Sequence, residues 1–171
     1  SGINLALAFT GQEEVYRKVF LKLGVNDSQL LEFFDGPAYL AWSRGQGMSG
    51  VGGPVPLKFL QQQWSLQQQI VQRQMELGIN SILPQFSGNV PKPFVRLFPQ
   101  ANISMQTGAN SGWLDGLDPL FEKVSTMVLQ QLIDDFGKTH FYEADGFFNH
   151  DTGPWMQRAS ERQRQRRRGS L

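Results

Sequence analysis

The chain has 171 residues, of which 40% are hydrophobic and 12% aromatic, and its formal net charge is +1. This length and apolar content suit one globular domain with a buried core, and they exclude wholesale disorder. The absence of cysteine excludes a disulfide scaffold, a thiolate metal site and a cysteine nucleophile. No apolar run reaches about 18 residues, so we expect no membrane span.

The positive charge is concentrated near the C-terminal end. Residues 158–171 hold six arginines and one glutamate, which leaves ten basic and 14 acidic residues in a mildly acidic segment 1–157. The stretch Glu161–Arg168 offers no apolar side chain to a core. We therefore expect a folded domain over residues 1–157 and a disordered arginine-rich tail over residues 158–171.

The N-terminal segment predicts a strand followed by a helix. Ile3–Phe9 is a nearly continuous apolar run, as expected for a strand that is buried on both faces in a parallel sheet. Apolar residues then recur at helical spacing, with Thr10 as a candidate cap and Gly24 as the stop. These apolar residues are Val15, Tyr16, Val19, Phe20 and Leu23.

The next segment predicts a short helix and a long loop. Leu30–Phe34 is expected to be helical, opened by Asp27 or Ser28. Glycine and proline are dense from Gly36 to Pro56, which indicates a mostly irregular loop. Long loops in compact domains are more often functional than idle, so this loop is a candidate part of a binding site.

The remaining elements complete an alternating order. Pro56–Leu77 predicts a helix, because an apolar stripe runs through its eight glutamines. Ile79–Leu83 predicts a second buried strand, Asp118–Phe136 a helix opened by an Asp-Pro pair, and Phe141–Asp145 a third strand. The stripe of the glutamine-rich helix is Leu60, Trp64, Val71 and Met75. Strands alternating with helices in this way favour a parallel α/β fold.

Parallel α/β folds bind ligands beyond the carboxyl ends of their strands. Here those ends are Thr10–Glu13, Gln85–Asn89 and Asp145–Asp151, which combine amides and carboxylates with aromatic rings. Amides and carboxylates pair with sugar hydroxyls, and aromatic faces cover the apolar side of a sugar ring. The strand ends therefore favour a carbohydrate ligand, and the sequence indicates neither a cofactor nor a metal site.

Four motifs follow one another along the chain: Gly2–Phe9 with Gly11-Gln12-Glu13, Glu32-Phe33-Phe34, Gly36–Trp42 and Ile82–Pro91. In this order they resemble glycoside hydrolase family 89, the alpha-N-acetylglucosaminidases. The resemblance runs from residue 1 to about residue 150. It implies a (β/α)8 TIM barrel that removes terminal alpha-linked N-acetylglucosamine with two glutamates and net retention. In animals the family acts in the lysosome during heparan sulfate breakdown.

The resemblance also implies that this chain is incomplete as a catalyst. A (β/α)8 barrel needs about 250 residues, and three strands are recognisable here, so we expect a partial barrel. The family's acid/base glutamate follows a motif like Ala-Asp-x-Phe-Asn-Glu, and Asn149, or His150 if one gap is allowed, stands in its place. The nucleophilic glutamate belongs to a later strand that has no counterpart before the tail. Because retaining hydrolysis needs two carboxyl groups, the sequence predicts that this chain alone is inactive.

Four residues are candidates for binding the sugar. The resemblance places Trp42 in the sugar pocket, although an ordinary core tryptophan is the other interpretation. Trp113, in the predicted loop 108–116, is either a second pocket tryptophan or a surface aromatic. Asp145 ends the third strand at the catalytic face, and Asn149 follows it.

Other polar residues favour structural interpretations. An acid at Glu13 is favoured by the dipole of the following helix without any ligand. Asp134 and Asp135 are expected to be solvated on their helix. His140 precedes the third strand at the opposite end of the barrel, where a structural role is expected.

Two functions of other classes stay open. A non-catalytic carbohydrate-binding relative would keep the barrel face without the acid. A nucleic-acid binder would use the arginine tail, but the tail lacks interleaved aromatics and segment 1–157 is acidic. An altered reading frame or a retained intron would produce such a tail as well.

The cellular route is indicated only by the resemblance and by short patterns. Asn26-Asp27-Ser28 and Asn102-Ile103-Ser104 fit the acceptor pattern for N-glycosylation, which is compatible with a secretory or lysosomal route. Ser1-Gly2-Ile3 shows no charged start followed by a hydrophobic region, so we expect no signal peptide within this chain.

Overall fold

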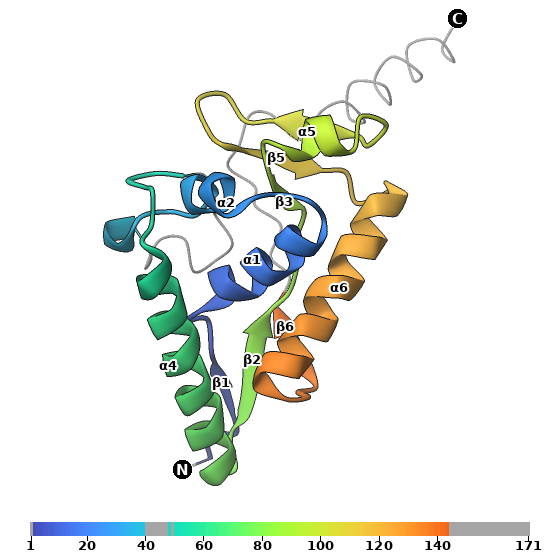
Figure 1. The fold of residues 1–171 in the computed structure, drawn as a ribbon. Coiled ribbons are helices and arrows are strands. Elements are labelled where there is room, and N and C mark those ends of the chain that lie inside the picture. Colours follow the sequence, from blue (N-terminus) through green and yellow to red (C-terminus); the bar gives the residue numbers. More distant parts are fainter. Residues whose placement is uncertain (1, 40–47, 49, 144–171) are drawn as a thin grey trace, which may run out of the picture.

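The computed structural model describes residues 2–39, 48 and 50–143, which form two small sheets with helices around them (Figure 1). The parallel sheet has the order β1-β2-β6, formed by β1 (Leu5–Leu7), β2 (Asn80–Pro84) and β6 (Phe141–Glu143). The antiparallel sheet has the order β3-β5-β4, formed by β3 (Asn89–Pro91), β5 (Ser111–Leu114) and β4 (Ile103–Met105). The helices are α1 (Gln12–Lys22), α2 (Asp27–Phe33), the 3-10 turn η1 (Pro37–Tyr39), α4 (Leu57–Glu76), α5 (Phe94–Leu97) and α6 (Pro119–Phe136).

The parallel sheet and its long helices confirm the predicted α/β order. α1, α4 and α6 contact one another, and α4 also packs on β2. The core lies between these helices and the sheet, where Val19, Phe20 and Val128 are fully buried. The carboxyl ends of β1 and β2 point toward α2, α5 and the antiparallel sheet (Figure 1).

The prediction that the first strand is buried on both faces is wrong. Leu5 and Leu7 of β1 are 42% and 61% exposed. Leu7 lies beside Ile82, and Ile82 lies beside Phe141, so one row of apolar side chains crosses the sheet. In a closed barrel such a row fills the interior. Three strands cannot close a barrel, so in the described residues this inner face is open.

The short helix begins earlier than predicted. α2 starts at Asp27, and its cap is Asn26 rather than Asp27 or Ser28. The Asn26 side-chain oxygen accepts the Gln29 backbone N–H at 3.0 Å, and the Gln29 side-chain oxygen accepts the Asn26 N–H at 3.3 Å. This reciprocal capping box satisfies two N–H groups that would otherwise lack partners at the helix start.

Glutamine side chains of α4 hold β1 in place. Gln67 is fully buried, its side-chain amide donates to the backbone oxygen of Ala8, and its oxygen accepts the Thr10 N–H at 3.2 Å. The Gln74 amide likewise donates to the Leu7 backbone oxygen at 3.2 Å. Met75, which the predicted stripe placed against the core, is 64% exposed. The glutamine content of this helix therefore has a structural role that hydrophobic periodicity does not show.

The segment between β2 and α6 is not a plain loop. It contains β3, α5, β4 and β5, whose strands have only three or four residues each. Such short strands have no periodicity of their own, and they are stabilised by pairing across the sheet. Gly112 in β5 is one requirement of that pairing, because a Cβ there would lie 2.9 Å from the side chains of Ile103 and Met105.

The last long helix has the predicted bounds. Asp118 caps α6 by accepting the Leu120 N–H at 2.9 Å, and Gly137 follows its last residue. Asp134 is exposed as expected. The prediction for Asp135 is wrong, because its carboxylate is 8% exposed and pairs with Lys18 of α1 at 2.8 Å.

We expect Gln67→Ala to lower the free energy of unfolding by about 2 to 4 kcal/mol, because two buried hydrogen bonds are lost and two backbone groups lose their partner. Urea unfolding followed by tryptophan fluorescence, at submicromolar concentration to limit self-association, measures the change. Gln69→Ala is the control, since Gln69 is exposed and bonds only within its own helix. Equal losses in the two variants would contradict this role for Gln67.

We expect the isolated chain to self-associate through the open inner face, because exposed apolar rows promote aggregation. Replacing Leu7 and Phe141 by serine should shift the chain toward the monomer in size-exclusion chromatography. Leu117→Ser, at a 77% exposed residue outside the sheets, should not. An unmodified chain that elutes as a monomer and unfolds in one sharp thermal transition would contradict this expectation.

Candidate functional site

The structure describes one of the predicted site residues, Trp113. Trp42, Asp145, Asn149 and His150 lie outside the described residues. The geometry of the site therefore comes from Trp113, from the side chains that follow β1 and β2, and from Glu143 at the end of β6.

Trp113 lies in β5 and not in a loop. Its side chain is 2% exposed, so the interpretation as a surface aromatic is wrong. β5 is the central strand of the antiparallel sheet, where Trp113 lies between Asn89 of β3 and Ser104 of β4. The tryptophan thus belongs to the antiparallel sheet that follows the carboxyl end of β2.

The carboxyl ends of the three parallel strands meet, as the topology predicts. The Gln85 N–H, directly after β2, donates to the backbone oxygen of Glu143 at the end of β6 with a distance of 2.7 Å. Glu13 follows β1 in the first turn of α1 and is 3% exposed. The helix dipole favours an acid at that position, but this carboxylate is buried at the strand ends rather than solvated.

Burial and the acids Glu13 and Glu143 change the pKa of Tyr16, which lies in α1. Burial raises the pKa of the Tyr16 hydroxyl well above its ordinary value, and the charges of Glu13 and Glu143 raise this pKa further. The Tyr16 ring also packs against Phe86, with 6.3 Å between the ring centroids. Glu13, Tyr16 and Phe86 are therefore buried together beyond the strand ends, and the half-buried Glu143 acts on the same hydroxyl from the end of β6.

A group of polar side chains in the antiparallel sheet was only partly predicted. Asn89, which the sequence placed at a strand end, is 4% exposed, and its side-chain oxygen accepts no hydrogen bond in the described part of the chain. The hydroxyl of Ser111 and the amide nitrogen of Gln106 are also buried in or beside this sheet, and neither has a hydrogen-bond partner among residues 2–39, 48 and 50–143. Such atoms are costly to leave unpaired and mark places where a ligand or water supplies the bond. Ser111 and Gln106 lie in or beside short strands, so no sequence signal singled them out.

The other end of the sheet carries a different set of residues. His140 lines a cavity of about 470 Å³ with residues from the end of α4, the start of β2 and the end of α6. This position, before β6, agrees with its predicted place away from the catalytic face.

Within residues 2–39, 48 and 50–143, no cluster of three or more histidine, aspartate and glutamate side chains could hold a metal ion. In the same ranges no helix has the length and apolar character needed to cross a membrane.

We expect Tyr16 to make folding sensitive to alkaline pH. Tyrosine in the unfolded chain ionises at about pH 10, whereas the raised pKa keeps Tyr16 protonated in the folded chain, so the folded state binds more protons above that pH. Its contribution is fully present below about pH 10, and it falls by up to about 1.4 kcal/mol per pH unit above that pH. Urea unfolding from pH 9 to 12 should show a shallower loss of stability in Tyr16→Phe. Identical slopes would refute this role of Tyr16.

Comparison with known proteins identifies the family. The model of the alpha-N-acetylglucosaminidase tim-barrel domain matches residues 1–166. Human alpha-N-acetylglucosaminidase is 37% identical over 155 residues, covering 86% of this chain and 21% of the human protein.

Solved structures give the same result. A family 89 glycoside hydrolase from Clostridium perfringens, in complex with 2-acetamido-1,2-dideoxynojirmycin, is 33% identical with a TM-score of 0.76, and the match covers 87% of this chain and 18% of that one. A second structure is a variant of the Clostridium perfringens enzyme CpGH89 with two glutamates changed to glutamine, in complex with its substrate GlcNAc-alpha-1,4-galactose. It is 33% identical with a TM-score of 0.75, and the match covers 86% of this chain and 18% of that one. The chain thus spans about a fifth of the length of these relatives. Together with the parallel sheet, these matches confirm that the chain belongs to the alpha-N-acetylglucosaminidase family, glycoside hydrolase family 89, as part of its TIM-barrel domain.

Proposed function

We propose that this chain is part of the catalytic barrel of a glycoside hydrolase that removes terminal alpha-linked N-acetylglucosamine, from glycans such as heparan sulfate, by retaining hydrolysis. The observation that carries the proposal is the meeting of the ends of β1, β2 and β6, in a chain whose relatives at this fold are family 89 enzymes. In TIM barrels the active site is built at that end. Residues 1–157 would form the barrel segment and residues 158–171 the arginine-rich tail.

The chain alone is proposed to be inactive. Retaining hydrolysis needs an acid/base and a nucleophilic carboxyl group about 5 to 5.5 Å apart. Asn149 or His150 takes the place of the first, and the second belongs to a strand that follows the matched segment. A histidine with an unperturbed pKa of about 6.5 is cationic at acidic pH and can donate a proton. Its positive charge, however, opposes the developing oxocarbenium ion.

Sugar contacts are assigned to Trp42, Trp113, Asp145 and Asn149. Trp113 lies in the central strand β5 beside Asn89, whose side-chain oxygen lacks a partner in the described residues. That amide oxygen suits the N–H of an N-acetylated sugar, and a direct contact with the buried Trp113 ring would require the ring to be uncovered.

A non-catalytic carbohydrate-binding role is the second candidate. It is favoured by one specific observation, the absence of a glutamate in the stretch 144–150. A lysosomal or secretory route is proposed from the family resemblance. It is supported by the exposure of Asn26 and Asn102, the asparagines of the two glycosylation patterns.

We expect no hydrolysis of an aryl alpha-N-acetylglucosaminide by the purified chain between pH 4 and 8, with at most weak binding of the sugar. The physical reason is the lack of both carboxyl groups. His150→Ala is the matched variant. Turnover that disappears in this variant would contradict the expectation and would identify the histidine as the acid.

A chimera tests the proposal itself. Residues 1–157 replace the matched segment of the human relative, and binding of 2-acetamido-1,2-dideoxynojirmycin shows that the chimera folds. The chimera should bind this inhibitor without hydrolysing substrate, and Asn149→Glu or His150→Glu should restore turnover. A folded chimera that stays inactive with either glutamate would favour the non-catalytic role.

A further inference from the structure

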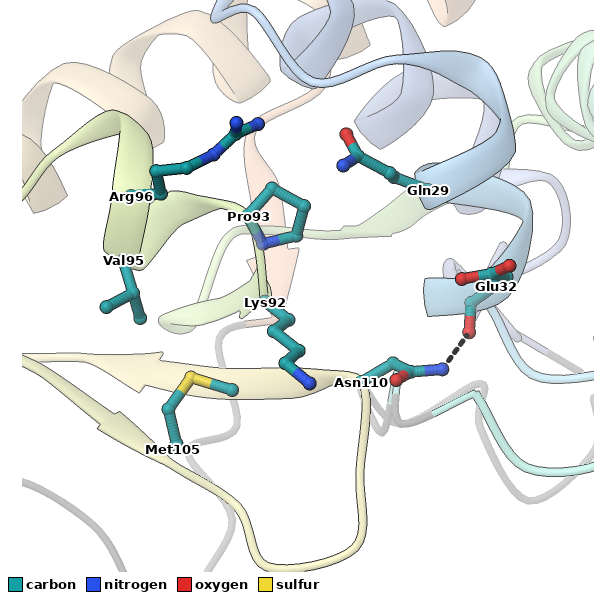
Figure 2. A pocket seen from close by; sticks show the side chains of 8 residues that line it. All are labelled: Gln29, Glu32, Lys92, Pro93, Val95, Arg96, Met105 and Asn110. Carbon is teal, nitrogen blue, oxygen red and sulfur yellow. Dashed lines mark hydrogen bonds between the residues drawn. The ribbon is translucent and has the colours of Figure 1, made fainter.

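A second cavity lies between α2 and the antiparallel sheet with α5 (Figure 2). Its volume is about 620 Å³, within the usual range of small-molecule sites. It lies on the side of the molecule to which the carboxyl ends of β1 and β2 point (Figure 1). Its lining residues are Gln29, Glu32, Lys92, Pro93, Val95, Arg96, Met105 and Asn110.

Two cations dominate the charge of this pocket. Lys92 follows β3, and Arg96 lies one helical turn later in α5. Figure 2 shows the Arg96 guanidinium extending toward Gln29 and the Lys92 ammonium extending toward Asn110. Neither cation forms an ion pair with any residue that the structure describes. Glu32 is the acidic residue among the lining residues, so the pocket has a net positive charge and suits an anion.

Two amides of the pocket are already held in place. The Gln29 oxygen is used by the capping box, which leaves its amide nitrogen as a donor. The Asn110 amide nitrogen donates to the Glu32 backbone oxygen at 3.3 Å, which leaves its side-chain oxygen as an acceptor. One fixed donor and one fixed acceptor suit a ligand that carries hydroxyl groups.

The remaining wall is apolar. Pro93, Val95 and Met105 line one side of the pocket. A sugar ring has apolar C–H groups on its faces, hydroxyls around its edge and, in acidic glycans, a sulfate or carboxylate. An inorganic anion has only the last of these features.

We propose that this pocket binds an anionic saccharide unit. Its sulfate or carboxylate is bound by Lys92 and Arg96, its hydroxyls by Gln29 and Asn110, and its ring packs on Met105 and Val95. The inference rests on the proposed function for the glycan nature of the ligand, and it adds an acidic unit besides the terminal N-acetylglucosamine.

Binding to the immobilised full chain, at low surface density, tests the proposal. The probes are N-acetylglucosamine 6-sulfate, glucuronic acid, neutral N-acetylglucosamine and inorganic sulfate. At least one acidic sugar should bind about tenfold or more tightly than the neutral sugar and than inorganic sulfate, and added salt should weaken it. The arm that binds more tightly identifies sulfate or carboxylate as the recognised group.

The variants decide which residues are responsible. Lys92→Ala with Arg96→Ala should weaken the acidic sugar about tenfold or more. Lys58→Ala with Lys123→Ala removes the same charge from exposed positions outside the pocket and should leave binding unchanged. Circular dichroism spectra identical to the unmodified chain ensure that lost binding is not lost folding.

Three results would overturn the proposal. They are no binding of either acidic sugar, binding of the neutral sugar or inorganic sulfate as tight as that of the acidic sugars, and equal loss of affinity in the two double variants. None of these results depends on hydrolysis. A chimera that fails to regain turnover therefore refutes the proposed function separately.

Discussion

The close approach of the β1–α1 turn to α4 is the constraint on which the site depends. Gly11 has a φ of 72°, and a Cβ there would lie 2.5 Å from the Cα of Trp64, so no larger residue fits without movement. The contact brings Gln67 to the backbone of Ala8 and Thr10, whose polar groups would otherwise be buried without partners. The start of α1 is thereby fixed beside the strand ends, where Glu13 and Tyr16 lie.

The open inner face is the structural consequence of a partial barrel. Helices cover one face of the parallel sheet, while Leu7 and Phe141 remain exposed on the other. A parallel sheet is stable when both faces are covered. The chain spans 21% of its human relative, and in a closed barrel further strands cover this face. A closed core therefore requires more strands than the described residues supply.

Caps, glycine stops and apolar runs in the sequence predicted those elements whose bounds are set by neighbouring residues. The Asp118 cap and Gly137 stop fixed the bounds of α6, and the apolar runs located β1 and β2. Parallel topology alone then predicted that the strand ends meet. The β3-β5-β4 sheet and the buried amide of Gln67 depend on contacts between distant residues, which periodicity does not record. Trp113 was placed in a loop for the same reason, and the roles of Trp42, Asp145, Asn149 and His150 stay predictions.

The central claim is that the inner face of this sheet belongs to a barrel completed by further strands. The chain has no cysteine, so Leu7→Cys introduces a single thiol on that face. The most direct measurement is the rate at which a thiol reagent labels it, in the isolated chain held at low concentration and in a fusion with the remaining barrel strands of the human relative. The account predicts fast labelling in the isolated chain and strong protection in the fusion, while Leu117→Cys is labelled fast in both. Equal labelling of Leu7→Cys in the two proteins would contradict it.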